Sequence, residues 1–437
     1  MKKSVFSGWW LVVGFCLLAI SAGAVPLKFT TVNDHADLLY RIGEEAVFTV
    51  TATDTNGVKA TDGVLTAVLD NFGPKTVTTL KVDLAKTNPF VLKGSLDEPG
   101  FLRLRVNAKG STAYNWSVGY EPTAIRKGSP SPDDFDAFWA AARAKLAKEV
   151  PLDAQVTPLK ERSMKQWNMY RISFATFGRR VYGYMSVPTD KAKAPYAVDF
   201  QVPGAGWGNW SNEMRGDAER IKLLVSVYPF EPRLDWKKPE AKALYDGIND
   251  AAKQKYGCSG YSQGGITVSR EAYFYYPVIL GIDRVVDWVA ARDDVDPKRF
   301  YYRGTSQGGG MGLALTALNH RFTRAAFFVP AMTDTMGYLK GRQSGWPSII
   351  ERNSSTPEGK AAAIANAPYF DAANFASRVA CPVRVLVGLG DTTCAPCAVY
   401  AAYNEIKVDD KDILRGPGMG HRCDRKLHGQ LEKWLFR

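Results

Sequence analysis

Hydrophobic and polar positions alternate in short runs over the N-terminal quarter of the chain, from residue 27 to about residue 122. The runs are rich in β-branched residues, and Asn, Gly and Pro separate them. This period-two pattern predicts strands, most clearly over 46–52, 64–69, 77–82 and 101–106. Short strands at this spacing are typical of a β-sandwich, so residues 25–126 are predicted to form a small, Ig-like sandwich domain. It holds no catalytic constellation, and its role as spacer, lid support or carbohydrate-binding module stays open.

The pattern becomes helical after a linker at residues 127–132. Ser131 is suited to cap a helix and Pro132 suits its first turn. The apolar stripe that follows has helical spacing and comprises Phe135, Phe138, Trp139, Ala142 and Leu146. We therefore expect a helix at the start of a second domain, residues 127–437.

Strands and helices alternate in this second domain. A hairpin is predicted from 170–176 and 181–187, turning near Gly178. Further strands are predicted over 196–202, 223–228, 299–303, 325–329, 383–387 and 412–414, with helices over 271–292, 309–319 and 424–435. Such alternation predicts an α/β domain with a mostly parallel sheet.

The first 24 residues have the three parts of a secretory signal peptide. Lys2 and Lys3 precede an apolar run at 9–20, and small residues at 21–24 suit cleavage after Ala24. The alternative is a retained N-terminal anchor. We expect an exported protein, periplasmic or secreted, without stable membrane insertion after cleavage.

Composition narrows the class further. Of 437 residues, 46% are hydrophobic and 23% charged, which excludes disorder and coiled coils, and no second apolar segment suggests a polytopic membrane protein. The net charge of +12 comes from scattered Lys and Arg with no basic-aromatic module, so no nucleic-acid partner is expected. An anionic envelope or acidic polymer nearby, or solubility alone, accounts for the charge.

The segment Gly304–Gly308 reads Gly-Thr-Ser-Gln-Gly and lies between a predicted strand and a predicted helix. This is the pattern of a nucleophile elbow, a sharp turn that projects the Ser306 hydroxyl above the sheet. The backbone N–H of Gln307 would help to bind an oxyanion. Residues 260–264 match the same motif around Ser262, but no apolar strand precedes them and no clean helix follows.

The general base can be found by elimination among four histidines. His35 belongs to the sandwich, His320 ends the helix after the elbow, and His428 lies within the last predicted helix. His421 follows a strand in a glycine-rich loop, as the Ser, acid, His order of α/β-hydrolases requires.

The acid should end a strand between Ser306 and His421, and Asp391 does so. Ser306 would then attack an acyl carbon, His421 would transfer its proton, and Asp391 would orient the imidazole. The second oxyanion donor should come from the loop at 203–207. Because Pro203 has no N–H, Gly204 or Ala205 is expected.

The cysteines and aromatic residues give weaker indications of function. Cys394 and Cys397 form a CxxC pair, which is a weak signal, and no spacing predicts zinc. No metal or organic cofactor is expected. The aromatic residues Trp207, Trp210 and Tyr273 could line a sugar-binding cleft or pack in the core.

From about Phe135 onward the chain resembles the acetyl xylan esterase/cephalosporin C deacetylase family of α/β-hydrolases. The motifs that carry the resemblance are Asp134–Trp139, Arg270 with Tyr273, Tyr275 and Tyr276, Gly304–Gly309, Tyr369–Ala376, Gly388–Asp391 followed by Cys394, and residues 398–404. The resemblance implies that Ser306, Asp391 and His421 are the family triad and Gln307 an oxyanion donor. It also implies a Ser-His-Asp esterase that works through an acyl-enzyme.

Three positions depart from the family pattern. Its Arg-Gly-Gln motif is absent from residues 226–232, its second oxyanion donor falls at Pro203, and its His-Glu pair is His421-Arg422 here. The family's ring-like hexamers suggest a homo-oligomer. The reaction class is unaffected, whereas the polymer, the acyl group and the assembly stay open.

The expected function is removal of acetyl groups from a poly- or oligosaccharide. The alternatives are a serine peptidase of the same fold and a non-catalytic glycan-binding homologue. If the triad forms, its loops bring Cys394 and Cys397 near Cys423, and export makes a disulfide bridge to Cys423 a further hypothesis.

Overall fold

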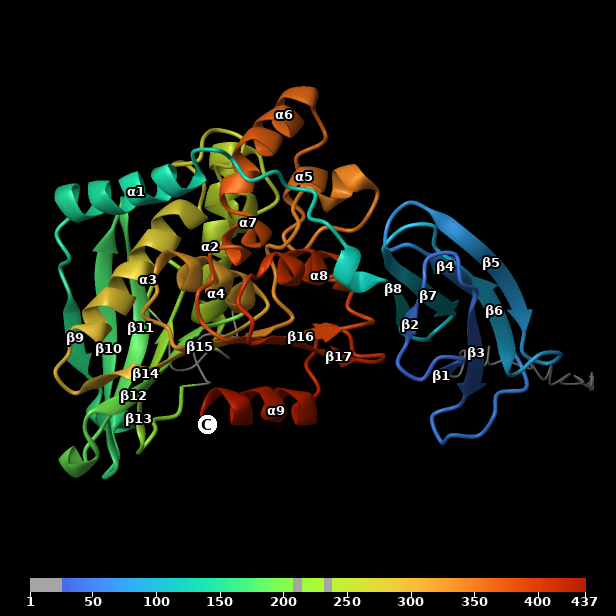
Figure 1. Cartoon of the computed structure of the whole chain (residues 1–437), viewed down its shortest axis with the longest axis horizontal. Coiled ribbons are helices and arrows are strands. Elements are labelled where there is room, and N and C mark those ends of the chain that lie inside the picture. The colour runs from blue at the N-terminus through green and yellow to red at the C-terminus, as the bar shows by residue number, and fades with distance from the viewer. Residues whose placement is uncertain (1–25, 207–213, 232–237) are drawn as a thin grey trace, which may run out of the picture.

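A computed structural model of the chain describes residues 26–206, 214–231 and 238–437. The predicted signal peptide lies outside the described residues. Figure 1 shows a domain of strands beside a larger domain of strands and helices. The predicted boundary at residues 126 and 127 falls in the segment that joins them. No helix in the described part of the chain is long and apolar enough to cross a bilayer.

The N-terminal domain is a sandwich of two sheets, with strand orders β1-β3-β6 and β2-β8-β7-β4-β5. In β3 the residues Ala46, Phe48, Val50 and Ala52 are fully buried, and the residues between them are partly exposed. The predicted alternation is therefore confirmed. The strands are β1 (Lys28–Asn33), β2 (Leu39–Tyr40), β3 (Ala46–Thr53), β4 (Val64–Asp70), β5 (Thr76–Asp83), β6 (Phe90–Gly94), β7 (Gly100–Ala108) and β8 (Tyr114–Tyr120).

The C-terminal domain has a nine-stranded sheet in the order β17-β16-β15-β14-β12-β13-β11-β10-β9. The strands β12 to β17 pair parallel with one another, and β11 pairs antiparallel with β13, so β9–β11 form an antiparallel edge. The bounds are β9 (Gln155–Pro158), β10 (Trp167–Thr176), β11 (Arg179–Pro188), β12 (Tyr196–Val202), β13 (Arg220–Val225), β14 (Val295–Thr305), β15 (Arg324–Phe328), β16 (Val383–Gly388) and β17 (Lys411–Gly416). The predicted α/β architecture is confirmed.

Helices cover both faces of this sheet (Figure 1). On one face α9 packs on β15 and β16, and on the other α3 and α4 pack on β10 and β14. The helices are α1 (Phe135–Glu149), α2 (Pro239–Tyr256), α3 (Tyr275–Ala290), α4 (Gln307–Leu318), α5 (Ile349–Arg352), α6 (Pro357–Asn366), α7 (Ala372–Ala376), α8 (Pro396–Glu405) and α9 (Arg425–Leu435). Neighbouring residues of a strand point to opposite faces of the sheet. In β15, Phe327 therefore packs in the hydrophobic core on one face and Phe328 in the core on the other.

The predicted helix start at Ser131 and Pro132 is wrong. α1 begins at Phe135, three residues later than Ser131 and Pro132 suggest. The Ser131 hydroxyl instead donates to Asn374 Oδ1 at 3.2 Å and accepts from Lys127 Nζ at 2.8 Å. Tertiary partners therefore use the group that was expected to cap the helix.

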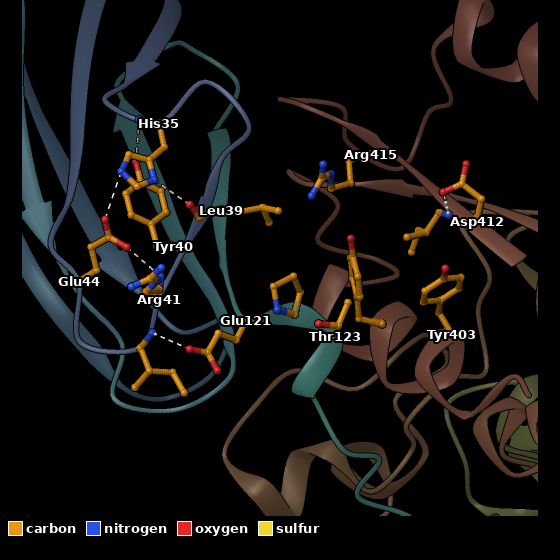
Figure 2. A pocket seen from close by; sticks show the side chains of 14 residues that line it. His35, Leu39, Tyr40, Arg41, Glu44, Glu121, Thr123, Tyr403, Asp412 and Arg415 are labelled. Carbon is orange, nitrogen blue, oxygen red and sulfur yellow. Dashed lines mark hydrogen bonds and ion pairs between the residues drawn. The ribbon is translucent and has the colours of Figure 1, made fainter.

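The two domains meet where β7 and the 3₁₀ turn η1 (Pro122–Ala124) contact α8. The Asn404 side-chain amide donates to the carbonyls of Pro122 and Ile125, each at 2.9 Å. A cavity of about 930 Å³ interrupts this junction between β2 and β17, with Tyr40 and Arg41 on one wall and Tyr403 and Arg415 on the other (Figure 2).

Candidate active site

Ser306 lies at the turn between β14 and α4, at the carboxyl end of the parallel sheet where α/β domains place their sites. Its φ is +56°, a left-handed conformation that is strained for a residue with a side chain. The strain is held by backbone hydrogen bonds, since Ser306 N donates to Phe328 O at 2.8 Å and Ala331 N donates to Ser306 O at 2.9 Å. The segment therefore has the geometry of a nucleophile elbow.

The turn is tight because Gly308 approaches β12 directly. A Cβ at this position would overlap the carbonyl oxygen of Val202. Any other side chain would push α4 away from the end of β12. The glycine pattern at 304–308 is thus explained by close packing of helix on strand.

Ser306, His421 and Asp391 form one continuous series of hydrogen bonds. Ser306 Oγ lies 2.9 Å from His421 Nε2, and His421 Nδ1 lies 2.8 Å from Asp391 Oδ2. The three residues follow β14, β17 and β16, whose carboxyl ends share one edge of the sheet. The structure thus brings together the three side chains selected from the sequence.

The environment of each group suits a different role. Asp391 is fully buried, and its other oxygen, Oδ1, accepts from the N–H groups of Thr393 at 2.8 Å and Cys394 at 3.0 Å. His421 keeps 33% of its side chain exposed, whereas Ser306 is buried, with 7% of the whole residue exposed. A buried acid held by backbone donors can fix an imidazole that remains accessible from the solvent side.

Gln307 is buried at the first position of α4, so its backbone N–H has no acceptor within the helix. Its side-chain Oε1 accepts from Tyr261 Oη at 2.8 Å and from Tyr275 Oη at 2.6 Å. Burial raises the pKa of both tyrosines well above the usual value, so both remain neutral hydroxyl donors. The two hydrogen bonds to its side chain therefore hold Gln307 in place, and with it the backbone N–H.

The loop with Gly204 and Ala205 lies against the same start of α4. Gln307 Nε2 donates weakly to Pro203 O at 3.5 Å, and Gly206 N donates to Tyr228 Oη at 2.9 Å. The hydroxyls of Tyr228 and Tyr261 are 3.4 Å apart. A tyrosine cluster (Tyr228, Tyr261 and Tyr275) thus joins the two segments that were predicted to supply oxyanion donors.

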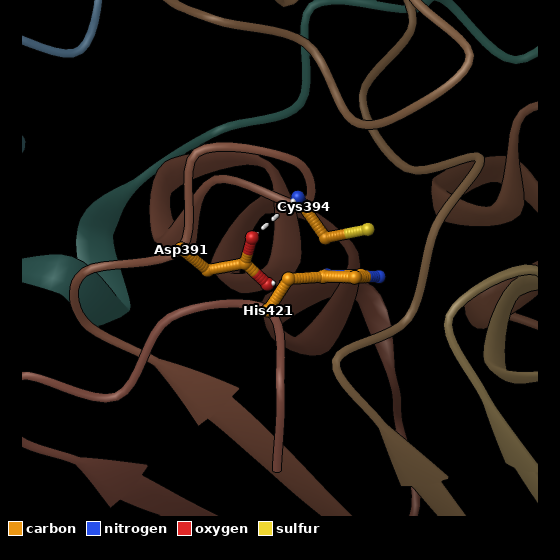
Figure 3. A group of neighbouring side chains, drawn as sticks. All are labelled: Asp391, Cys394 and His421. Atoms are coloured by element: carbon orange, nitrogen blue, oxygen red, sulfur yellow. Dashed lines mark hydrogen bonds and ion pairs between the residues drawn. The ribbon is translucent and has the colours of Figure 1, made fainter. Parts of the chain in front are cut away.

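Cys394 lies beside the imidazole, as Figure 3 shows. Asp391, Cys394 and His421 each offer one metal-ligand atom within 4.8 Å of the others. Both carboxylate oxygens already accept hydrogen bonds from His421 and from the two backbone N–H groups. Burial raises the pKa of the Cys394 thiol well above its usual value, which keeps it protonated.

The predicted disulfide is not formed. All five cysteines in the described residues are free thiols. Cys397 is buried, and its sulfur donates to Gln343 O at 3.4 Å, so it is turned toward that loop.

The remaining sequence candidates have other surroundings. Ser262 lies in a 3₁₀ turn, η4 (Tyr261–Gln263), after α2, with no strand before it. His320 is exposed and lies two residues beyond the end of α4, the His428 ring stacks on Phe328 with ring centroids 4.2 Å apart, and His35 Nδ1 donates to Leu39 O at 2.8 Å in the sandwich. None of these histidines is a hydrogen-bond partner of Ser306 in the described structure.

Of the predicted aromatic cleft, Trp207 and Trp210 lie outside the described residues. Tyr273 is fully buried, and its hydroxyl donates to Ser262 O at 3.0 Å. It therefore packs in the core, which is the second of the two roles that the sequence left open for it. The support of Gln307 by Tyr261 and Tyr275 was not predicted from the sequence, although Tyr275 was noted there. The three residues lie on separate segments of the chain, and only the folded structure brings them together.

Comparison with known proteins extends this description. Residues 122–437 match the acetyl xylan esterase (AXE1) family. The chain is 28% identical over 424 residues to the acetyl esterase Axe7A of Xylanibacter ruminicola, and the match covers 95% of this chain and 92% of that protein. It therefore includes most of the N-terminal domain.

Two solved structures share the fold. The acetyl xylan esterase from Paenibacillus sp. R4 superimposes with a TM-score of 0.59 at 23% identity, over 72% of this chain and 98% of that one. Acetyl xylan esterase 1 from Thermoanaerobacterium sp. JW/SL YS485 gives 0.58 at 21% identity, with the same shares. With an α/β-hydrolase fold and a match over most of its length, the chain belongs to the acetyl xylan esterase (AXE1) family and is a carboxylic-ester hydrolase.

Proposed function

We propose that the protein is an exported acetyl esterase that deacetylates a poly- or oligosaccharide with Ser306, His421 and Asp391 as its catalytic triad. The observation that carries the proposal is the pair of hydrogen bonds, 2.9 and 2.8 Å, that join these three side chains. The relative named an acetyl esterase supports the choice of acyl group.

In the first half of the reaction, Ser306 Oγ attacks the acetyl carbonyl carbon while His421 Nε2 accepts its proton. The negative charge on the carbonyl oxygen would be stabilised by the backbone N–H of Gln307 and by that of Gly204 or Ala205. The bond from the carbonyl carbon to the sugar oxygen then breaks, and His421 gives its proton to that oxygen.

In the second half, water attacks the acetyl group on Ser306 and loses a proton to His421. The bond to Ser306 Oγ breaks, acetate leaves, and the proton returns to the serine. Asp391 stabilises the imidazolium in both halves without itself taking the proton.

Hydrolysis of 4-nitrophenyl acetate and butyrate tests the assignment. Ser306→Ala should lower kcat/KM for acetate by about three or more orders of magnitude, because the nucleophile is lost. The wild type should prefer acetate to butyrate and should release acetate from acetylated xylan. Ser262→Ala is the matched control, since it changes the second motif with the same residue type, and it should keep wild-type activity.

The opposite pattern would overturn the proposal. If Ser262→Ala is inactive and Ser306→Ala is not, the second motif holds the nucleophile. If neither matters, or if amides are cleaved better than esters, the acetyl esterase mechanism is wrong.

Export is supported by the basic start, apolar run and small residues of the first 24 positions. The intact mass of protein recovered from the periplasm or medium should correspond to a chain that begins at Val25. An intact Met1 in a membrane fraction would instead support a retained anchor.

A further inference from the structure

Strand β8 of the sandwich runs along the loops that carry the acid and the base. It pairs with β7 from Tyr114 to Tyr120 but with β2 only at Gly119 and Tyr120. Over residues 115–117 the loops after β16 and β17 take the place of a second neighbouring strand. An open strand edge is thereby covered by loops of the other domain (Figure 1).

The first contact is with the loop that follows β16 and carries Asp391, residues 389–395, which we call the acid loop. Ser117 is fully buried, and its hydroxyl donates to the carbonyl oxygen of Leu389, two residues before Asp391. The next residue, Gly390, passes so close to β8 that a Cβ there would lie 2.7 Å from Asn115 O. The backbone before Asp391 therefore has no room to move toward the sandwich.

The second contact is with the loop that follows β17 and carries His421, residues 417–424, which we call the base loop. The Trp116 ring lies on Gly418, three residues before His421, where a Cβ would be 2.7 Å from a ring carbon. The ring is fixed in turn, because Trp116 Nε1 donates to Asn33 Oδ1 at 2.8 Å.

The two loops are also bonded to each other. Leu389 N donates to Gly416 O at 3.0 Å, and Gly390 N donates to Met419 O at 2.9 Å. Support given to one loop is therefore transmitted to the other.

The sandwich reaches the acid loop by a second route, through the turn at Asn71–Gly73. Phe72 O accepts from Gln343 N at 2.7 Å, and the Gln343 side chain donates to Thr392 O. Trp346 N from the same segment donates to Thr393 O at 3.1 Å. Asp391 is thus flanked by β8 before it and by the Gln343 segment after it.

We propose that the sandwich domain positions the acid–base pair, and that Ser117 is its principal positioning residue. The inference rests on the proposed triad. A displacement of about 1 Å in a catalytic group can cost about a hundredfold in rate, so a contact that fixes Leu389 and Gly390 also controls the alignment of Asp391 with His421. Loss of the Ser117 hydroxyl would leave a buried carbonyl without its partner, which favours movement of the loop.

The test uses the full-length protein. Ser117→Ala should lower kcat for 4-nitrophenyl acetate at least tenfold with KM within twofold, because alignment rather than substrate binding is changed. The rate at which a fluorophosphonate probe labels Ser306 should fall by a similar factor. Tyr114→Phe is the matched control: it deletes a hydroxyl from the same strand, one that donates to Thr31 Oγ1 at 3.0 Å inside the sandwich. It should keep wild-type kcat and labelling.

A second variant protects against misfolding of the first. Trp116→Phe removes the ring edge over Gly418 and should lower kcat severalfold with an unchanged KM. If both variants match Tyr114→Phe in kcat and in labelling while their melting temperatures fall, the sandwich only stabilises the protein and the positioning role is wrong.

His421→Ala separates the two proposals. It should abolish labelling of Ser306. If it labels like the wild type, the triad itself is wrong and the positioning role falls with it. If it is inactive while Ser117→Ala is fully active, only the positioning role is overturned.

Discussion

The proposed nucleophile and the proposed acid–base pair are supported from different parts of the molecule. Ser306 follows β14, which has strands on both sides, and the packing of Gly308 on Val202 and of two tyrosines on Gln307 all comes from the C-terminal domain. Asp391 and His421 follow β16 and β17, and β17 is the edge strand of the sheet. Their loops are covered by β8 of the sandwich.

The difference follows from the sheet. A strand in the middle of a sheet has neighbours and helices that can hold the turn after it, whereas loops at the edge lack cover on one side. The N-terminal domain supplies that cover here. Three substitutions test this comparison.

The largest effect is expected from Gly308→Ala. The added Cβ would overlap a backbone carbonyl that cannot rotate away, so we expect a loss of about 3 kcal/mol or more in the free energy of unfolding and at least a hundredfold slower labelling of Ser306. Gly429→Ala in α9 is the control, because no atom lies within 4 Å of its added Cβ. If Gly308→Ala unfolds and is labelled like the wild type, the close contact of Gly308 with Val202 does not fix α4.

A smaller effect is expected from Asp70→Asn in the sandwich. Asp70 is buried and accepts from Arg103 Nε at 2.8 Å, Arg105 Nε at 2.6 Å and Phe72 N at 3.0 Å. Removing the charge should cost about 2 kcal/mol in urea unfolding, and kcat should fall severalfold because the Phe72 turn supports the Gln343 segment.

Glu45→Gln is the control for that variant. Glu45 pairs with Lys93 at 2.9 Å, and both side chains are more than half exposed, so stability and kcat should stay near wild type. If Asp70→Asn loses stability and keeps kcat, the sandwich and the acid loop are not coupled through the turn.

The smallest effect is expected from Tyr275→Phe. Gln307 Oε1 keeps its bond from Tyr261, so the loss should be about 1 kcal/mol, or roughly fivefold in kcat if it is felt in the transition state. Tyr273→Phe deletes an equally buried hydroxyl that donates to Ser262 O instead, and it should keep kcat. Equal kcat for the two variants would mean that the tyrosine cluster stabilises the core without orienting Gln307.

The proposed chemistry could be inferred from the sequence because it depends on local rules. A strand, a glycine-flanked serine and a helix must form an elbow, and an acid and a histidine at the ends of later parallel strands must reach the same edge. Strands with strict alternation, such as β3, were equally clear. The positions of Ser306, Asp391 and His421 could therefore be selected before their distances were known.

β8 could not be predicted in this way. It contains Asn115, Ser117 and Gly119, and Ser117 is buried against Leu389 rather than exposed, so the usual polar-out alternation is missing. The same reason explains Ser131, whose hydroxyl bonds to Asn374 instead of capping α1.

The sequence by itself determined the order of the strands along the chain, the elbow and the types of residue that could act as nucleophile, base and acid. Only the tertiary structure decided that Tyr273 is core, that Tyr275 holds Gln307, and that a separate domain lies on the acid and base loops. The local sequence pattern reflects contacts between residues that are only a few positions apart in the chain. Contacts such as Ser117 with Leu389 join residues far apart in the chain, and they exist only once both domains have folded and packed.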